Sequence, residues 1–316
     1  MKRTIASLLC LLLLAGCTPA GQDELQPQVN IVATTYPAYL AALTVTEGVP
    51  GVSVSRLDTG SVSCLHDYAL TVNDMKKLSR ADVVVMNGAG MEDFMSDALA
   101  SSDAAVIDCS EGILLLPAGG HHDHEHHDHE HGHFDGHYWM DPLRMSAAVD
   151  NVLTGLLRYF DLPCSEQMAQ NANTAHLLLN QCRQDGRDTL RNTSLSNAAL
   201  ITFHDGFAYF AAAFDLPLLA SIEEEAGSEA SAKEIIHITE LVQEHELPAI
   251  FTEVNGSDAT ARAISRETGC SVYALSTVMD GREPYADDIS PIMPYIEIMN
   301  INTAAVAGAF SPKEVE

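Results

Sequence analysis

The amino-acid sequence predicts an α/β protein with two parallel-sheet lobes joined by a long helix. Short, apolar, strand-like runs alternate with helical segments in two separate series along the chain. A stretch with helical patterning and no strand signal separates the two series. The length of 316 residues also exceeds what one hydrophobic core usually serves. These three observations favour two lobes with a cleft between them, which is a usual place for a ligand.

The first series of strands lies in the N-terminal third of the chain. The expected strands are residues 29–34, 52–57, 81–87 and 104–108. Residues 72–78 read as a helix, because Thr71 and Asp74 have the spacing of a capping box. Continuous apolar strands separated by helices indicate a parallel sheet that is covered on both faces.

The second series follows a helical stretch at residues 143–195, in which 165–191 has the pattern of one long helix. The expected strands are residues 199–203, 248–252 and 271–275. The expected helices are residues 204–214, 231–246, 258–268 and 294–310. This alternation predicts a second parallel α/β lobe.

The N-terminus has the pattern of an export signal. Basic residues Lys2 and Arg3 precede an apolar run at residues 5–15, which is too short to span a bilayer as a stable helix. The run ends at Leu14-Ala15-Gly16-Cys17, which resembles a bacterial lipobox. We therefore expect cleavage before Cys17, a lipid on Cys17 and an extracytoplasmic protein anchored to the membrane. An ordinary signal peptide with an incidental cysteine is the alternative.

These patterns divide the chain into five parts. Residues 1–16 are the expected signal peptide, and 17–28 are a polar tether behind the lipid anchor. Residues 29–142 form the N-terminal lobe, which carries a histidine-rich insert at 119–134. The helical connection is expected at 143–197 and the C-terminal lobe at 198–316.

The charge and cysteine counts exclude some classes of function. The formal charge of −28 argues against nucleic-acid binding, which needs a basic face. No CxxC spacing occurs, so a cysteine-based zinc site is not indicated. Disulfide pairing stays open among five cysteines of the expected mature chain: Cys64, Cys109, Cys164, Cys182 and Cys270.

The insert holds eight of the 14 histidines of the chain, mixed with four acidic residues. Such a segment cannot build a core, and its imidazoles and carboxylates bind divalent metals weakly at several sites. A solubilising spacer is the alternative. The expected weak ligands are His121, His122, His124, His126, His127, His129, His131 and His133.

Three further histidines form the candidate metal centre. His66 follows the second expected strand, and His204 directly follows the strand at 199–203. In parallel α/β sheets ligands bind at the carboxyl ends of strands, so each lobe supplies one imidazole. His137 lies at the junction between the first lobe and the helical stretch, from which it reaches the same cleft. Three neutral imidazoles suit zinc and leave a fourth position.

The fourth ligand stays open between Glu253, Asp280 and water. Asp67 and Asp205 are adjacent to ligand candidates, where each is expected to accept an imidazole N–H and fix its tautomer. Three other histidines sit in helical patterns and are expected to be ordinary helix residues. They are His176, His237 and His245.

Five short segments in order resemble the zinc and manganese class of substrate-binding lipoproteins of bacterial ABC transporters, the ZnuA-like cluster A-I family. The resemblance covers about residues 28–310. Residues 81–92 look like the family's "AD-apolar-NG-x-G-x-E", 137–142 like "H-x-W-x-D-P" and 203–210 like "FHDA-x-x-Y". Residues 251–253 and 267–269 match the last lobe. The histidine-rich insert before the second motif is typical of the zinc branch.

The resemblance implies two α/β lobes joined by a long helix, with one metal in the cleft. Carried over residue by residue, the ligands are His66, His137 and His204. The implied partners are a membrane permease and an ATPase, and we expect a monomer with no catalytic residues. Two positions depart from the family: Leu65 replaces the usual proline, and Thr277 takes the position of a carboxylate. Losing that hard ligand while keeping three imidazoles favours Zn²⁺ over Mn²⁺.

Three alternatives remain at this stage. They are a manganese-binding protein of the same transporter class, a metal-binding adhesin and a secreted zinc hydrolase. Three histidines with an open position are also a catalytic arrangement. However, no HExxH motif occurs, and no glutamate has the helical spacing of a general base.

Overall fold

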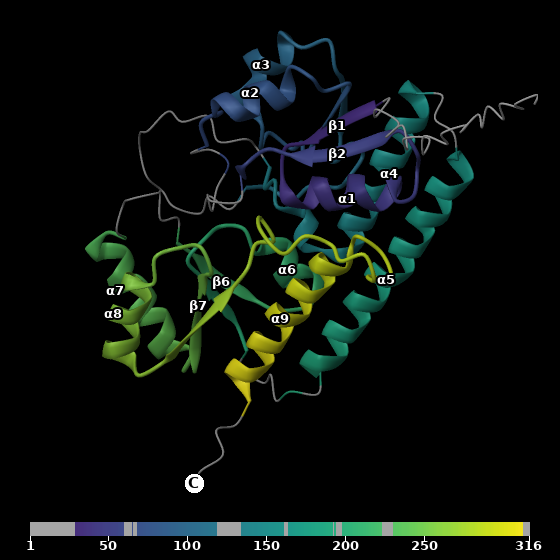
Figure 1. The fold of residues 1–316 in the computed structure, drawn as a ribbon. Helices are drawn as coiled ribbons and strands as arrows, with labels where there is room; N and C mark the ends of the chain where they lie inside the picture. Colours follow the sequence, from purple (N-terminus) through teal and green to yellow (C-terminus); the bar gives the residue numbers. More distant parts are fainter. Residues whose placement is uncertain are drawn as a thin grey trace, which may run out of the picture.

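The computed structural model describes residues 29–59, 65, 68–118, 134–160, 164–191, 193, 198–222 and 230–311. Within them lie two four-stranded sheets in which every strand pairing is parallel. Figure 1 shows one sheet in each of two lobes, with long helices running along one side of both. This arrangement confirms the predicted fold class.

The first sheet has the strand order β2-β1-β3-β4. Successive residues of β3 point to opposite faces, as strand geometry requires. Val83 and Val85 enter the large core, whereas Val84 packs in a smaller cluster with Leu78 and Met95. The elements of this lobe are β1 (Val29–Ala33), α1 (Tyr36–Thr46), β2 (Val52–Arg56), α2 (Val72–Leu78), β3 (Val83–Met86), η3 (Asp93–Met95), α3 (Ser96–Ala100) and β4 (Ala105–Asp108).

The predicted helix α2 begins as the sequence indicates. Thr71 accepts a hydrogen bond from the main chain of Asp74, and the carboxylate of Asp74 accepts one from the main chain of Thr71. This capping box satisfies two amide groups that the first turn of a helix leaves without partners.

The second sheet repeats the same topology in the order β6-β5-β7-β8. The sequence pattern does not predict its strand β6, and the helix expected at residues 204–214 is shorter because residues 204–206 form a turn. The elements are β5 (Leu200–Thr202), α6 (Ala208–Ala213), β6 (Leu218–Ser221), α7 (Ala232–Glu244), β7 (Ala249–Glu253), α8 (Ala259–Thr268), β8 (Ser271–Leu275) and α9 (Met293–Phe310).

Each sheet therefore has a topological switch point at the carboxyl ends of two strands. The chain leaves β1 toward β2 on one side and returns to β3 on the other, and β5 and β7 repeat this arrangement. Ligands of open α/β sheets bind in the crevice at such a point. The topology predicts a site where the ends of β1 and β3 meet those of β5 and β7.

Two helices connect the sheets. After η4 (Tyr138–Met140), α4 spans Pro142–Tyr159 and α5 spans Ser165–Arg191. At 27 residues, α5 is about 40 Å long, enough to run along both lobes. It packs on α1 and α4 at one end and on α9 at the other (Figure 1).

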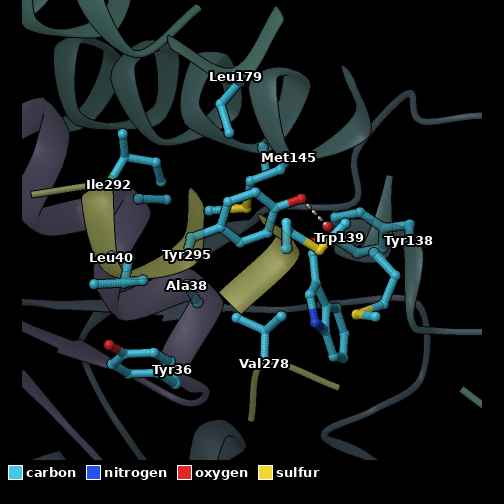
Figure 2. Close-up of a cluster of buried hydrophobic side chains, with 14 of the residues drawn as sticks. Tyr36, Ala38, Leu40, Tyr138, Trp139, Met145, Leu179, Val278, Ile292 and Tyr295 are labelled. Carbon is cyan, nitrogen blue, oxygen red and sulfur yellow. Dashed lines mark hydrogen bonds between the residues drawn. The ribbon is translucent and has the colours of Figure 1, made fainter. Parts of the chain in front are cut away.

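One hydrophobic core is continuous between the lobes. Its fully buried side chains come from strands of both sheets and from helices that include α1, η4, α4, α5 and α9. Figure 2 shows Tyr36, Trp139, Leu179 and Tyr295 in one cluster. The hydroxyl of Tyr295 donates a hydrogen bond of 2.7 Å to the main-chain oxygen of Trp139. The lobes are therefore joined by packed side chains as well as by the chain itself.

The four cysteines that the structure describes are free thiols: Cys109, Cys164, Cys182 and Cys270. Cys64 and Cys17 lie outside the described residues. Among the helices of the described ranges, none combines the length and the apolar character needed to cross a membrane.

A close approach of helices at Gly186 gives a test of this packing. A Cβ atom on Gly186 of α5 would lie 2.5 Å from Phe214 Cε1 and 3.0 Å from Thr303 Cγ2. We expect Gly186→Ala to lower the free energy of unfolding by about 1–3 kcal/mol through overpacking. Urea denaturation of the metal-free protein measures the change.

Gly308 in α9 is the matched control, because a Cβ atom there has no neighbour within 4 Å. Gly308→Ala should raise the free energy of unfolding by about 0.4–1 kcal/mol. Equal effects of the two substitutions would contradict the close packing of α5 against Phe214 and Thr303.

Candidate metal centre

Two histidines from different parts of the chain meet at the predicted edge of the sheets. His204 follows β5, and His137 immediately precedes η4. Their Nε2 atoms are 3.3 Å apart, and the two rings are nearly perpendicular. Two nitrogens bound to zinc at 2.0–2.1 Å in tetrahedral geometry lie about 3.3–3.4 Å apart. The separation of the two imidazoles is therefore that of two ligands of one zinc ion.

The carboxylate of Asp135 orients His137. Its Oδ1 accepts hydrogen bonds from the main-chain N–H and from Nδ1 of His137, each at 2.8 Å. An ionised carboxylate only accepts, so Nδ1 carries the proton and Nε2 keeps its lone pair toward His204. The hydroxyl of Tyr209 in turn donates to the main-chain oxygen of Asp135 at 2.8 Å.

The environment of His137 changes its pKa. Burial lowers the pKa of His137, but the hydrogen bond and negative charge of Asp135 raise it, and the net pKa lies above its ordinary value. His137 is 7% exposed and lies beside the indole of Trp139, with ring centroids 5.1 Å apart. The Nε1 of Trp139 donates to the main-chain oxygen of Thr277 at 2.8 Å, which joins this part of the site to the second lobe.

Gly206 makes room for both imidazoles. A Cβ atom on Gly206 would lie 2.6 Å from Cδ2 of His204 and 3.1 Å from Cδ2 of His137. The first distance is shorter than real Cβ atoms show, and the second is tighter than most of their contacts. The turn after β5 thus needs glycine for the arrangement seen here, although the family motif has alanine at this position.

Glu253 lies next to His204 at the end of β7. Its Oε2 is 3.9 Å from Nδ1 of His204, and its Oε1 accepts a short hydrogen bond from the hydroxyl of Thr277. Burial raises the pKa of Glu253, while the Thr277 hydrogen bond lowers it; the net pKa lies above its ordinary value. Glu253 is 4% exposed, so its carboxyl group faces the two imidazoles rather than bulk water.

The structure places Asp280 in a different environment. Its carboxylate pairs with Arg56 of β2 at 3.1 Å, and its side chain is 50% exposed. The guanidinium of Arg56 also lies over the ring of Tyr36, 4.7 Å from the centroid. Of the two carboxylates expected as a fourth ligand, only Glu253 lies beside a candidate histidine.

Of the remaining predicted site residues, only Asp205 lies in the described part of the chain. Asp205 accepts a hydrogen bond from the hydroxyl of Ser221 at 2.8 Å, which joins the turn after β5 to β6. His66 and Asp67 lie outside the described residues, as do all eight histidines of the insert. In the described ranges, no three or more His, Cys, Asp or Glu side chains are grouped so that they would hold a metal ion. The described part of the centre is the pair His137 and His204 with Glu253 beside it.

Sequence reasoning missed Asp135, the residue that orients His137. Asp135 stands two positions before His137, a spacing that lets one carboxylate bind both the main chain and the ring of the histidine. It also follows an acid-rich segment, so composition alone does not single it out.

The Asp135–His137 pair predicts a pH effect. Because the folded pKa of His137 is raised, the pair contributes its full stability below the ordinary histidine pKa of about 6.5. That contribution is lost as the pH rises through the folded pKa. In Asp135→Asn the hydrogen bond and the charge of Asp135 are lost while burial remains, so the pKa of His137 should fall, which an NMR titration of the ring protons measures.

The control is Asp97→Asn, on the exposed surface of α3, which should leave the titration of His137 unchanged. The same titration midpoint for His137 in the wild type and in Asp135→Asn would contradict the assigned role of Asp135.

Comparison with known proteins finds zinc-binding relatives of this chain. The chain is 27% identical over 319 residues to the zinc-binding lipoprotein AdcA of Streptococcus pneumoniae, covering 94% of this chain and 58% of that protein. It is 30% identical over 282 residues to the zinc-binding protein AdcA of Streptococcus pyogenes, covering 82% of this chain and 52% of that protein. The chain thus spans about half the length of these curated relatives.

Solved structures share the fold. A crystal structure of ZnuA superposes with a TM-score of 0.74 at 23% identity, covering 90% of this chain and 99% of that chain. A laminin-binding adhesin (Lmb) of Streptococcus agalactiae superposes with a TM-score of 0.72 at 20% identity, covering 90% of this chain and 100% of that chain. At these identities the likeness shows the fold alone.

The family model described as "ZnuA: Zinc-uptake complex component A periplasmic" matches residues 31–309. This match confirms the resemblance predicted from the five motifs and the expectation of a binding protein rather than an enzyme. The family description also agrees with a location outside the cytoplasm. Since the match covers most of the chain, the protein belongs to the family of periplasmic zinc-uptake component A.

Proposed function

We propose that this protein captures Zn²⁺ outside the cytoplasm and delivers it to an ABC importer. The observation that carries the proposal is the 3.3 Å separation of the Nε2 atoms of His137 and His204. One histidine alone would not indicate a zinc site, but the pair offers two imidazole nitrogens at the distance that tetrahedral zinc requires. His66, from the loop after β2, is the proposed third ligand.

Zinc fits the proposed site better than manganese. Imidazole nitrogen suits zinc, whereas manganese prefers carboxylate and water oxygen. Of the carboxylates around the imidazole pair, Asp135 bonds Nδ1 of His137, away from the two Nε2 atoms. Glu253 lies beside His204, and its oxygen Oε1 is already engaged by the hydroxyl of Thr277.

The fourth ligand is proposed from the same contacts. Glu253 is the proposed fourth ligand ahead of water, because it is buried beside the imidazole pair and its charge also acts on His137; its nearest atom of His204 is Nδ1, at 3.9 Å. Asp280 is a weaker candidate, because its carboxylate pairs with Arg56.

The partners follow from the family and from the N-terminal sequence. Members of this family are components of a zinc-uptake complex, so the proposed partners here are a membrane permease and its ATPase. A lipid on Cys17 would hold the protein at the membrane, with residues 17–28 as a tether. We propose that the protein acts as a monomer, because the residues assigned to the metal all come from one chain.

The ligand assignment is tested by zinc titration of the purified, lipid-free protein. Each of His66→Ala, His137→Ala and His204→Ala should weaken the tightest zinc site by more than about 100-fold, because loss of a ligand exceeds loss of its supporting hydrogen bond. His245→Ala, at the C-terminal end of α7, is the control and should leave the affinity unchanged. An intact tight site in all three variants would refute the assignment.

The same variants test delivery in cells that lack the wild-type protein. Growth in zinc-depleted medium should be restored by the wild type and by His245→Ala, but not by the three ligand variants. Added zinc should restore growth in every case. If manganese rather than zinc restores growth, the proposed substrate of the transporter is wrong.

The insert is proposed to collect metal weakly near the cleft. The described structure stops at Ala118 and resumes at Phe134, which pairs with Pro117 in an antiparallel bridge. Deleting residues 119–133 keeps both partners of that bridge and Asp135. Calorimetry should then show loss of the weak zinc sites and an unchanged tight site. Loss of the tight site on deletion would contradict this division of roles.

A further inference from the structure

Buried polar contacts at the carboxyl end of β3 connect the first lobe to the segment that carries His137. We call residues 135–138 the arm and residues 87–92 the turn. We propose that Asn87 of the turn is a positioning residue for metal binding, because it fixes the arm and so sets the place of the His137 imidazole. This inference rests on the proposed zinc function and goes beyond its ligands.

Asn87 contacts the arm on both sides of His137. Its side-chain Nδ2 donates to the main-chain oxygen of Gly136 at 3.2 Å. Its own main-chain oxygen accepts a hydrogen bond from the hydroxyl of Tyr138 at 2.8 Å. Asn87 is 1% exposed, so water does not compete for these bonds. The residue before His137 and the residue after it are therefore both held by one asparagine.

Glu92 holds Asn87 in place. Its carboxylate accepts hydrogen bonds from the main-chain N–H groups of Asn87 and Gly88, at 2.8 and 3.0 Å. The hydroxyl of Thr34, just after β1, donates to the same carboxylate at 2.5 Å. Burial raises the pKa of Glu92 and these hydrogen bonds lower it; the net pKa is about 7. The turn is thus fixed to the end of β1 as well as to β3.

The turn and the arm are in close contact at Gly136. A Cβ atom on Gly136 would lie 2.6 Å from Cγ of Met91. Gly88 has a positive φ of 80°, and a Cβ atom there would lie 1.8 Å from Oδ1 of Asp108. The Gly136 contact puts the arm against the turn, and the Gly88 contact puts the turn against the end of β4.

The opposite side of the arm is held by the second lobe. Tyr209 of α6 donates to the main-chain oxygen of Asp135, and Trp139, which follows the arm, donates to Thr277, each at 2.8 Å. Figure 2 shows Trp139 and Tyr138 side by side in the core between the lobes. The second lobe therefore holds the far side of the arm, and the Asn87 side chain adds to the contacts of the first lobe, which also include the bond from the Asp135 N–H to the main-chain oxygen of Leu116 at 2.9 Å. Without the Asn87 amide, the residue before His137 loses its hydrogen bond to the turn.

Asn171 provides a matched control for a purely structural role. Its side-chain Nδ2 donates to the main-chain oxygens of Val45 and Glu47, at 3.2 and 2.8 Å, and the residue is buried. It joins α5 to the end of α1 and lies outside the arm and the turn. Asn87→Ala and Asn171→Ala each remove buried hydrogen bonds from a side-chain amide to main-chain oxygens. We therefore expect both substitutions to lower the free energy of unfolding.

The experiment compares zinc affinity, by competition titration, in four variants of the lipid-free protein: Asn87→Ala, Asn171→Ala, His137→Ala and the double variant of positions 87 and 137. Asn87→Ala should lower the affinity roughly tenfold or more, as loss of support behind a ligand does. Asn171→Ala should stay within about twofold of the wild type. In the His137→Ala background, Asn87→Ala should have no further effect, because the group it positions is gone.

A second readout needs no metal. In the metal-free protein, the NMR signal of the His137 Nδ1 proton, held by Asp135, should shift or broaden in Asn87→Ala and remain in Asn171→Ala. If Asn87→Ala does not fold, Tyr138→Phe removes only the hydroxyl bond to Asn87 and should lower zinc affinity about two- to fivefold.

The outcomes separate the two proposals. Equal affinity changes in Asn87→Ala and Asn171→Ala, or an equal loss in the His137→Ala background, would overturn the positioning role of Asn87. A wild-type protein without a tight zinc site would refute the proposed function, while the Nδ1 proton signal would still decide whether Asn87 fixes His137.

Discussion

The metal centre depends on the hydrophobic core that continues from one lobe into the other. His137 and His204 are 67 positions apart in sequence, and the separation of their Nε2 atoms is set by how the lobes pack. Side chains of α1, α5 and α9 occupy one cluster, and α5 packs against both lobes. Protein interiors are close-packed and resist small deformations, so this core holds the two imidazoles near the spacing that zinc requires.

Polar contacts then orient the side chains that the core brings near one another. Asp135 fixes the tautomer and direction of His137, and Thr277 engages one oxygen of Glu253 beside His204. These groups are buried, where a hydrogen bond left unmade costs more than it does at the surface. The high negative charge of the chain favours cations in general, whereas the paired imidazoles select among them.

Much of the fold could be predicted from the sequence because its elements have local signals. The bounds of the helix Ser165–Arg191 and of the capped helix Val72–Leu78 agree with the sequence pattern. The strand Leu218–Ser221 escapes prediction, because it is short, only half-buried and has no β-branched or aromatic residue. At the site, His137 and His204 could be found from their motifs. Asp135 acts over a spacing of two residues, but it follows an acid-rich segment and does not stand out there. Asn87 acts on main-chain atoms of a segment 49 positions away, which only the fold brings together.

The segment from Thr277 to Asp280 joins the metal centre to the contact between the lobes. At one end Thr277 binds Glu253, and at the other Asp280 pairs with Arg56 of the first lobe. Between them Val278 is fully buried with a φ of 62°, a conformation that costs a β-branched residue about 1–3 kcal/mol and persists only where packing imposes it. Separation of the lobes has to break the Arg56–Asp280 pair. The four residues from Thr277 to Asp280 therefore carry both a contact of the carboxyl group beside His204 and a contact between the lobes, which places the two within one short, packed stretch of chain.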